Sequence, residues 1–293
     1  MRLPLPRQRC FLCEQESSRV RITLQDTPAN WFVGDGVGPG GRPQLMHVPM
    51  LLGHISRLPV ELDALVLTSD LQARERLFHR SGHPPKLFGE AVAAELADWM
   101  RTQGLALADT GVVLAGDFWS APTDAAKRGG YGDVRPVWDA FADRFGRVVG
   151  VPGNHDLFEP SPSREPSAAA WRGDVQLLER SCIDWGGVSV SGVGGCVGNE
   201  TRPFRYNERH QLGRLLQAVS EQPDLLLLHQ GPPGDGRARG GAHQVEDCLR
   251  FVEKDTLVVC GHEHATQRVH EVGRAQVVNV HEAVLVLTRD HAP

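Results

Sequence analysis

The sequence lacks the features that mark membrane and secreted proteins. None of its apolar runs approaches the ~20 residues that a membrane span needs, so we expect no membrane association. The first ten residues, MRLPLPRQRC, lack the apolar centre of a secretory signal. Six cysteines in 293 residues are too few and too scattered for a disulfide framework. We therefore expect a protein of the reducing cytoplasm.

The chain also lacks an excess of basic residues. It has 31 Lys and Arg against 36 Asp and Glu, which gives a formal net charge of -5. This balance excludes a global positive field that would attract nucleic acid or an anionic membrane. A local basic patch is still compatible with it, and a bound divalent metal would reverse the charge of an acidic pocket.

A second cysteine pair is missing as well. Cys10 and Cys13 form a lone C-x-x-C motif, and a structural zinc site of this kind usually needs another pair. The remaining cysteines are dispersed singly: Cys182, Cys196, Cys248 and Cys260. We interpret Cys10 and Cys13 as a reduced pair near a surface terminus. The alternative is a small zinc site completed by a distant residue.

Residues 61–293 alternate between apolar runs and amphipathic segments. The apolar runs predict buried strands at 62–70, 111–117, 147–151, 224–229 and 256–264. The amphipathic segments predict helices at 84–104, 134–146, 206–221 and 243–254. Further strands are expected at 186–195, 267–272, 275–280 and 283–288. This alternation favours a layered α/β fold.

Residues 1–60 are less regular. The segment RVRITL at 19–24 alternates like a strand, and GDGVGPGGRP at 34–43 predicts a loop. We treat residues 1–60 as an amino-terminal extension of the same domain and residues 61–293 as the principal domain. The extension is a candidate for an added hairpin or a cover at the site, and the sequence assigns it no role.

Five of the predicted buried strands end in side chains that can bind a metal. These side chains are Asp70, Asp117, Asn154 after a Pro-Gly turn, His229, and His262 with His264. In open α/β folds, ligands bind beyond the carboxyl ends of the strands, so we expect these donors to meet at one rim. His262 and His264 alternate along an extended segment, which predicts that both face the same side.

Each of these residues also has a simpler interpretation. Asp70 and Asp117 fit helix N-caps, Asn154 and Asp156 fit turn residues, and His229 alone fits a core histidine. None of these separate roles predicts that such residues follow one strand after another.

Together the segments resemble the signature of the calcineurin-like metallophosphoesterase superfamily. The matching segments are SDLQ (69–72), AGDFW (115–119), PGNHD (152–156), LLLLHQGPPG (225–234) and CGHEH (260–264). The chain departs from the pattern at Gln72, where the family usually has histidine. The resemblance implies two packed mixed β-sheets flanked by helices, with metals at one sheet edge.

The resemblance further implies two divalent cations bridged by Asp117. Its first cation would be held by Asp70, Gln72, Asp117 and His264, and its second by Asp117, Asn154, His229 and His262. Two such cations, ~3.5–4 Å apart, share a hydroxide that attacks the phosphoryl group in line. The amide oxygen of Gln72 favours Mn²⁺, with Mg²⁺, Zn²⁺ and Fe as alternatives.

For catalysis, the resemblance implies that His155 protonates the leaving oxygen and that Asp156 orients His155. Basic residues of two loops are candidates for binding the substrate: Arg202, Arg205, Arg237, Arg239 and His243. Solvated loop charges are the simpler interpretation of any one of them. Trp119 and Tyr131 are candidates for stacking a base.

The function expected from this site is hydrolysis of a phosphate ester. We favour a phosphodiester, with single-stranded DNA or RNA as a candidate substrate. A phosphomonoesterase or nucleotide hydrolase is the alternative within the same chemistry. An alternative of another class is a catalytically silent scaffold with the metallophosphoesterase fold, which the departure at Gln72 would favour.

Overall fold

The larger of two main β-sheets has eight strands. The structure is a computed structural model that describes residues 19–37, 42–76, 85–121, 130–158, 171–234, 241–265 and 267–289. The strand order is β1 (Ile22–Leu24), β3 (Pro43–Ile55), β18 (Ala283–Arg289), β4 (Ala64–Ser69), β5 (Thr110–Leu114), β7 (Arg147–Gly150) and β9 (Val175–Leu177), and β2 (Asn30–Val37) pairs with β3. β4, β5 and β7 are parallel, whereas β18 is antiparallel to β4, so the sheet is mixed.

The second main sheet has six strands. Their order is β10 (Cys182–Trp185), β11 (Val188–Val193), β14 (Leu225–Gln230), β15 (Thr256–Gly261), β17 (Ala275–Asn279) and β16 (Val269–Val272). The four central strands are parallel, and β10 and β16 at the edges are antiparallel to their neighbours. Two small ladders complete the pairing: β12 (Cys196–Val197) with β13 (Arg205–Tyr206), and β6 (Gly132–Asp133) with β8 (Asp156–Leu157).

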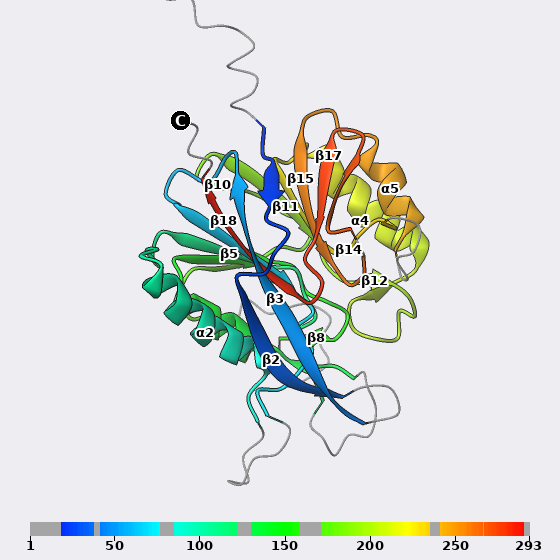
Figure 1. Cartoon of the computed structure of the whole chain (residues 1–293). Coiled ribbons are helices and arrows are strands. Elements are labelled where there is room, and N and C mark those ends of the chain that lie inside the picture. Colours follow the sequence, from blue (N-terminus) through cyan, green and yellow to red (C-terminus); the bar gives the residue numbers. More distant parts are fainter. Residues whose placement is uncertain are drawn as a thin grey trace, which may run out of the picture.

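The two sheets pack face to face, and helices cover their outer faces (Figure 1). The helices α2 (Phe88–Thr102) and α3 (Arg135–Ala142) pack on the larger sheet, while α4 (Glu208–Ser220) and α5 (His243–Leu249) pack on the smaller one. The expected fold, two packed mixed sheets flanked by helices, is confirmed. Within the described ranges, helices long and apolar enough to cross a membrane are absent.

Successive side chains of each buried strand belong to different hydrophobic cores. In β4, Val66 joins the core under α2 and α3, whereas Leu65 and Leu67 join the core between the sheets. In β14, Leu227 faces the core between the sheets, and Leu226 faces α4 and α5. Because successive side chains of a strand point to opposite faces, a continuous apolar run serves two cores at once.

The helix ends follow capping chemistry. Asn207 precedes α4, and its side chain accepts a hydrogen bond of 2.9 Å from the backbone N–H of His210. Glu90 in the first turn of α2 accepts a bond of 2.8 Å from the backbone N–H of Leu87. Gly104 follows α2 with a φ of 75°, a left-handed conformation that ends the helix as predicted.

The amino-terminal region contains a long β-hairpin formed by β2 and β3, one of the two arrangements considered for residues 1–60. β2 includes residues 34–37, so the expectation of a loop there is wrong for these residues; residues 38–41 lie outside the described part. Position 34 of this strand requires glycine, because a Cβ there would lie 2.7 Å from the ring of Phe88 in α2. The glycine therefore permits close packing rather than a turn. β3 then joins the larger sheet beside β18.

Candidate metal centre

The predicted metal ligands lie at the carboxyl ends of the central strands of both sheets. Asp70 follows β4, Asp117 follows β5, Asn154 follows β7, His229 is near the end of β14, and His262 follows β15. All five are buried or partly buried. The chain therefore brings residues separated by up to 192 positions into hydrogen-bonding contact, as between Asp70 and His262.

Tight backbone turns aim these side chains at one another. Asp70, Asp117 and His262 have φ values of 57°, 62° and 66°, in the left-handed region. Non-glycine residues seldom adopt this region, and such strain clusters at functional sites. Glycine is also required here, because a Cβ on Gly153 would lie 2.1 Å from the Asp117 carboxylate.

Three ligand atoms converge at the predicted second cation position. Nε2 of His229 lies 3.4 Å from Oδ2 of Asp117 and 3.2 Å from Nδ1 of His262. The Nδ1–H of His229 donates to the carbonyl of Ala115 at 2.8 Å, so Nε2 is left to face the cluster. One ligand atom from each of the three residues fits within 4.8 Å of the others, as a shared cation requires.

The side chain of Asn154 provides an independent test of whether these residues fit a cation. Asn154 is 2% exposed, and its Oδ1 and Nδ2 are buried and make no hydrogen bond in the described part of the structure. Buried polar atoms without partners are rare and costly. A divalent cation held by Asp117, Asn154, His229 and His262 would satisfy the amide oxygen, and the carboxylate and imidazole donors suit such an ion.

The pKa values of the histidines in this cluster also favour a bound cation. Burial lowers the pKa of His229, but the carboxylates of Asp117 and Asp70 outweigh burial and raise the pKa to about 9. Burial and the neighbouring His229 lower the pKa of His262 to about 4. The site therefore stabilises positive charge between Asp117 and His229, and a cation would compete with a proton for that position.

The residues predicted for the first cation make separate side-chain contacts. Nε2 of Gln72 donates to Oδ2 of Asp117 at 3.2 Å. Oδ2 of Asp70 lies 3.3 Å from Nδ1 of His281, a residue that the sequence analysis missed. His264 is exposed, and its ring centroid lies 4.1 Å from that of His281.

The segment that carries His262 and His264 is not extended, contrary to expectation. β15 ends at Gly261, and the left-handed φ of His262 turns the chain, so the two rings join different clusters. The sequence does contain a feature that could have identified His281. This residue closely follows the buried strand β17, just as the other predicted ligands follow their strands.

Asp156 has a different role from the one expected. Its carboxylate accepts hydrogen bonds of 2.8 Å from the backbone N–H groups of Asp117, Phe118 and Gly153. Burial and the charge of Asp117 nevertheless raise the pKa of Asp156 to about 6. Both oxygens are occupied, so Asp156 positions the Asp117 loop and does not orient the ring of His155. The ring of His155 instead donates from Nδ1 to the carbonyl of Gly130.

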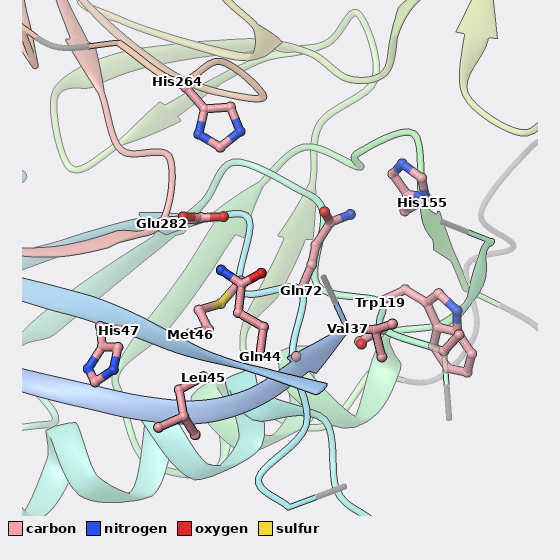
Figure 2. Close-up of a pocket in the computed structure, with 13 residues that line it drawn as sticks. Val37, Gln44, Leu45, Met46, His47, Gln72, Trp119, His155, His264 and Glu282 are labelled. Atoms are coloured by element: carbon pink, nitrogen blue, oxygen red, sulfur yellow. The ribbon is translucent and has the colours of Figure 1, made fainter. Parts of the chain in front are cut away.

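A pocket of about 490 Å³ opens beside the cluster. Figure 2 shows His155, Gln72, His264 and Glu282 around it, with Val37 and Gln44 of the β2–β3 hairpin along one side. The hairpin thus forms a wall of the pocket.

Of the predicted substrate-binding residues that the structure describes, none lines this pocket. Arg202, Arg205 and His243 do not line it, and Arg237 and Arg239 lie outside the described residues, as do Cys10 and Cys13. Trp119 does line it. However, Gly132 packs against the Trp119 ring, where a Cβ would lie 2.5 Å away, and the guanidinium of Arg74 lies 4.9 Å from the ring centroid. Trp119 therefore lines the pocket with part of its ring covered by Gly132 and Arg74, and its role in stacking a base stays a prediction.

Comparison with known proteins is consistent with this geometry. A family model described as calcineurin-like phosphoesterase matches residues 64–266, which is more than half of the chain. A comparison with curated proteins finds no match.

Proposed function

The chain belongs to the calcineurin-like phosphoesterase family, and on this premise we propose that it is a cation-dependent phosphodiesterase. The observation that carries the proposal is the unpartnered side chain of Asn154 beside the converging ligand atoms of Asp117, His229 and His262. A scaffold without catalytic function has no need for a buried, unsatisfied amide at this position, because such a group costs about 1–3 kcal/mol.

Some residues of the centre would bind the cation, and others orient those ligands. Asp117, Asn154, His229 and His262 would hold one divalent cation. When bound, a pair of divalent cations supplies Lewis-acid activation of a water molecule and of a phosphoryl oxygen. The carbonyl of Ala115 keeps the proton of His229 on Nδ1, which leaves Nε2 as the ligand atom.

His155 is the general acid in this proposal. It lines the pocket, and its Nδ1 is occupied by the carbonyl of Gly130. Nε2 is therefore the atom that donates a proton to the leaving oxygen. The backbone N–H of His155 donates to Oδ1 of Asp117 at 2.8 Å, which ties the acid to the cation site.

The charge of the pocket favours a diester over a monoester. A phosphomonoester carries about -1.5 to -2 charges at neutral pH, and a diester carries one. Of the described residues that line the pocket, none is Lys or Arg. A second full negative charge would have no fixed cationic side chain to bind it there.

Cleavage of single-stranded DNA or RNA is the narrower form of the proposal. Its support comes from the basic loop residues Arg202, Arg205, Arg237 and Arg239, which are candidates for contacts with the phosphates of a nucleic-acid backbone.

The test is a comparison of substrates on metal-depleted protein reloaded with Mn²⁺, Mg²⁺ or Zn²⁺. We expect kcat/KM for bis-p-nitrophenyl phosphate to exceed that for p-nitrophenyl phosphate by at least about tenfold, which corresponds to about 1.4 kcal/mol. Single-stranded and duplex oligonucleotides of one sequence test the narrower form. Preference for the monoester would indicate a phosphomonoesterase, and absence of both turnover and cation binding would indicate the scaffold.

A further inference from the structure

A second group of metal-binding side chains lies beside the first. His264, His281 and Glu282 each offer one ligand atom within 4.8 Å of the others. Nδ1 of His281 is also 3.3 Å from Oδ2 of Asp70, the carboxylate predicted for the first cation. Asp70 also accepts a hydrogen bond from the backbone N–H of His262, so it connects this group to the rest of the centre.

The ring of His281 is buried and faces carboxylates, and its backbone is firmly held. His281 is 9% exposed, and neither ring nitrogen makes a hydrogen bond in the described part of the chain. Its Nδ1 lies 3.3 Å from Oδ2 of Asp70, and its Nε2 lies 3.6 Å from Oε1 of Glu282. Its N–H donates to Oδ1 of Asn279 at 2.9 Å, and its carbonyl accepts from Arg268 at 3.0 Å. A rigid turn thus presents a buried imidazole beside two carboxylates, a donor set that suits a divalent cation.

The turn that carries His281 is also attached to the loop that carries His264. Nδ2 of Asn279 donates to the carbonyl of Glu263 at 2.9 Å, while Oδ1 of the same side chain binds His281. Asn279 therefore holds the two histidine-bearing segments together. Such supporting contacts are typical of metal sites, where they orient the ligands.

Gln72 is a poor substitute for the usual histidine in this arrangement. Its Nε2 faces Oδ2 of Asp117, and an amide N–H₂ cannot bind a metal. The reversed amide would place its oxygen against a carboxylate oxygen. Gln72 is thus a hydrogen-bond donor to the carboxylate expected to bridge the cations.

We propose that a divalent cation at the first position is bound by Asp70, His264 and His281, with the carboxylate of Glu282 as a further ligand. His281 then supplies the imidazole that Gln72 does not. Two imidazoles with carboxylates suit Mn²⁺, Fe²⁺ or Zn²⁺ better than Mg²⁺, which prefers oxygen ligands. The inference rests on the proposed function, because it concerns the second cation of the same centre.

The experiment is a count of bound Mn²⁺ on metal-depleted full-length protein, by calorimetric titration and by metal analysis after dialysis. The parent should bind two Mn²⁺ per chain, whose magnetic coupling is visible by electron paramagnetic resonance. His281→Ala should bind one, with affinity for the other reduced at least about tenfold, the least that even supporting contacts contribute. Gln72→Ala and the exposed control His54→Ala should keep both.

Folding is checked by circular dichroism and thermal melting in a chelator, where His281→Ala and the parent should agree. His281→Gln, which retains most of the side-chain volume, serves if the alanine variant does not fold, and it should also lose one Mn²⁺. His229→Ala should lose the other cation, so the double variant His229→Ala/His281→Ala should bind none.

Retention of two Mn²⁺ with parental affinity in His281→Ala would overturn the inference, as would loss of one in Gln72→Ala. A parent that binds only one cation, lost in His229→Ala, would also overturn it. These results would leave the proposed function standing if the parent still cleaves the diester. Failure of the proposed function would differ: the parent would bind no Mn²⁺, or would not cleave the diester.

Discussion

The two ends of the smaller sheet place polar residues in very different surroundings. At the amino-terminal end, Asp224 accepts bonds from the N–H and hydroxyl of Ser189 at 2.9 and 2.8 Å and from Lys254 at 2.9 Å. At the carboxyl-terminal end, the side chains of Glu263 and His281 are buried and make no hydrogen bond in the described part of the protein. These buried polar side chains are thus hydrogen-bonded at the amino-terminal end of the sheet, whereas Glu263 and His281 at the carboxyl-terminal end are not.

Left-handed backbone occurs at both ends but is concentrated at the carboxyl-terminal rim of the two sheets. Asp70, Asp117, His262 and Glu282 have positive φ values at this rim, whereas Gln222, before β14, has one at the amino-terminal end. Burial raises the pKa of Glu263, between the two histidines, to about 8. One end therefore contributes to the stability of the fold, and the other carries strain and desolvated polar groups that a ligand could relieve.

The largest effect should come from Asp117→Asn at the carboxyl-terminal rim. Asparagine can keep the bond from the N–H of His155 but loses the charge that binds cations. We expect kcat/KM for bis-p-nitrophenyl phosphate to fall at least about 10³-fold, since cations supply several kcal/mol of transition-state stabilisation. Steady-state kinetics and metal analysis measure the effect; parental turnover would show that Asp117 does not bind the cations.

His155→Ala should lower kcat without reducing the number of bound Mn²⁺ ions. Loss of a general acid typically lowers kcat by about 10²–10⁴-fold. The bound Mn²⁺ should stay at the parental number, because the ring of His155 bonds to Gly130 rather than to the ligand cluster. His54→Ala, an exposed histidine on β3, is the control. A His155→Ala protein with full turnover would remove the residue from the mechanism.

Asp224→Ala tests the opposite end. It leaves Ser189 and Lys254 without their acceptor, so we expect the free energy of unfolding to fall by about 2–3 kcal/mol. Cation number and kcat/KM of the folded protein should not change. Urea unfolding measures the loss, and Asp98→Ala, at an exposed position of α2, should stay within about 0.5 kcal/mol of the parent. Loss of Mn²⁺ in folded Asp224→Ala would contradict the separation of the two ends.

The contribution of Asp224 should also depend on pH. Burial raises its pKa, but the bonds donated by Ser189 and Lys254 outweigh burial and hold the pKa below its ordinary value. A depressed pKa means that the stabilisation is present above the unfolded-state pKa of about 3.9 and is lost as the pH falls through the folded-state value. The difference in unfolding free energy between parent and Asp224→Ala should therefore narrow at acid pH. An unchanged difference would show that the charge of Asp224 is not stabilising.

The smallest effect on stability should come from Asn154→Ala. Its amide makes no hydrogen bond in the described structure, so the metal-free protein should change in unfolding free energy by less than about 1 kcal/mol. With Mn²⁺ present, the parent alone should gain the stabilisation that ligand binding confers. If metal-free Asn154→Ala lost as much stability as Asp224→Ala, the contrast between the two ends would fail.

Much of this centre could be predicted from the sequence because the ligands follow buried parallel strands. The positions of Asp117, His229 and His262 needed only the strand runs and the rule that ligands gather at strand ends. The role of Asp156 could not be predicted, because its neighbour His155 points elsewhere and the direction of a side chain in a turn depends on the backbone. His281 was missed because the family signature does not contain it, although it follows β17 in the same way.

The fold was predictable where strands are fully apolar and less so elsewhere. β10 has two exposed residues and one half-exposed residue among its four, so it gives no apolar run to detect. The glycines of β2 resembled a loop because the sequence does not show that Phe88 of α2 packs against them. Tertiary packing, rather than local preference, determined both segments.

The β2–β3 hairpin belongs to two parts of the molecule at once. The carboxyl-terminal half of β3 is hydrogen-bonded to β18 in the larger sheet, whereas residues 44–47 border the pocket and carry none of the proposed ligands. Exchange of these border side chains would reshape what enters while leaving the cation-binding groups in place. Substrate selectivity can therefore change without a change in the cation-binding residues. Residues 44–47 of the hairpin are the positions at which to engineer a new substrate preference.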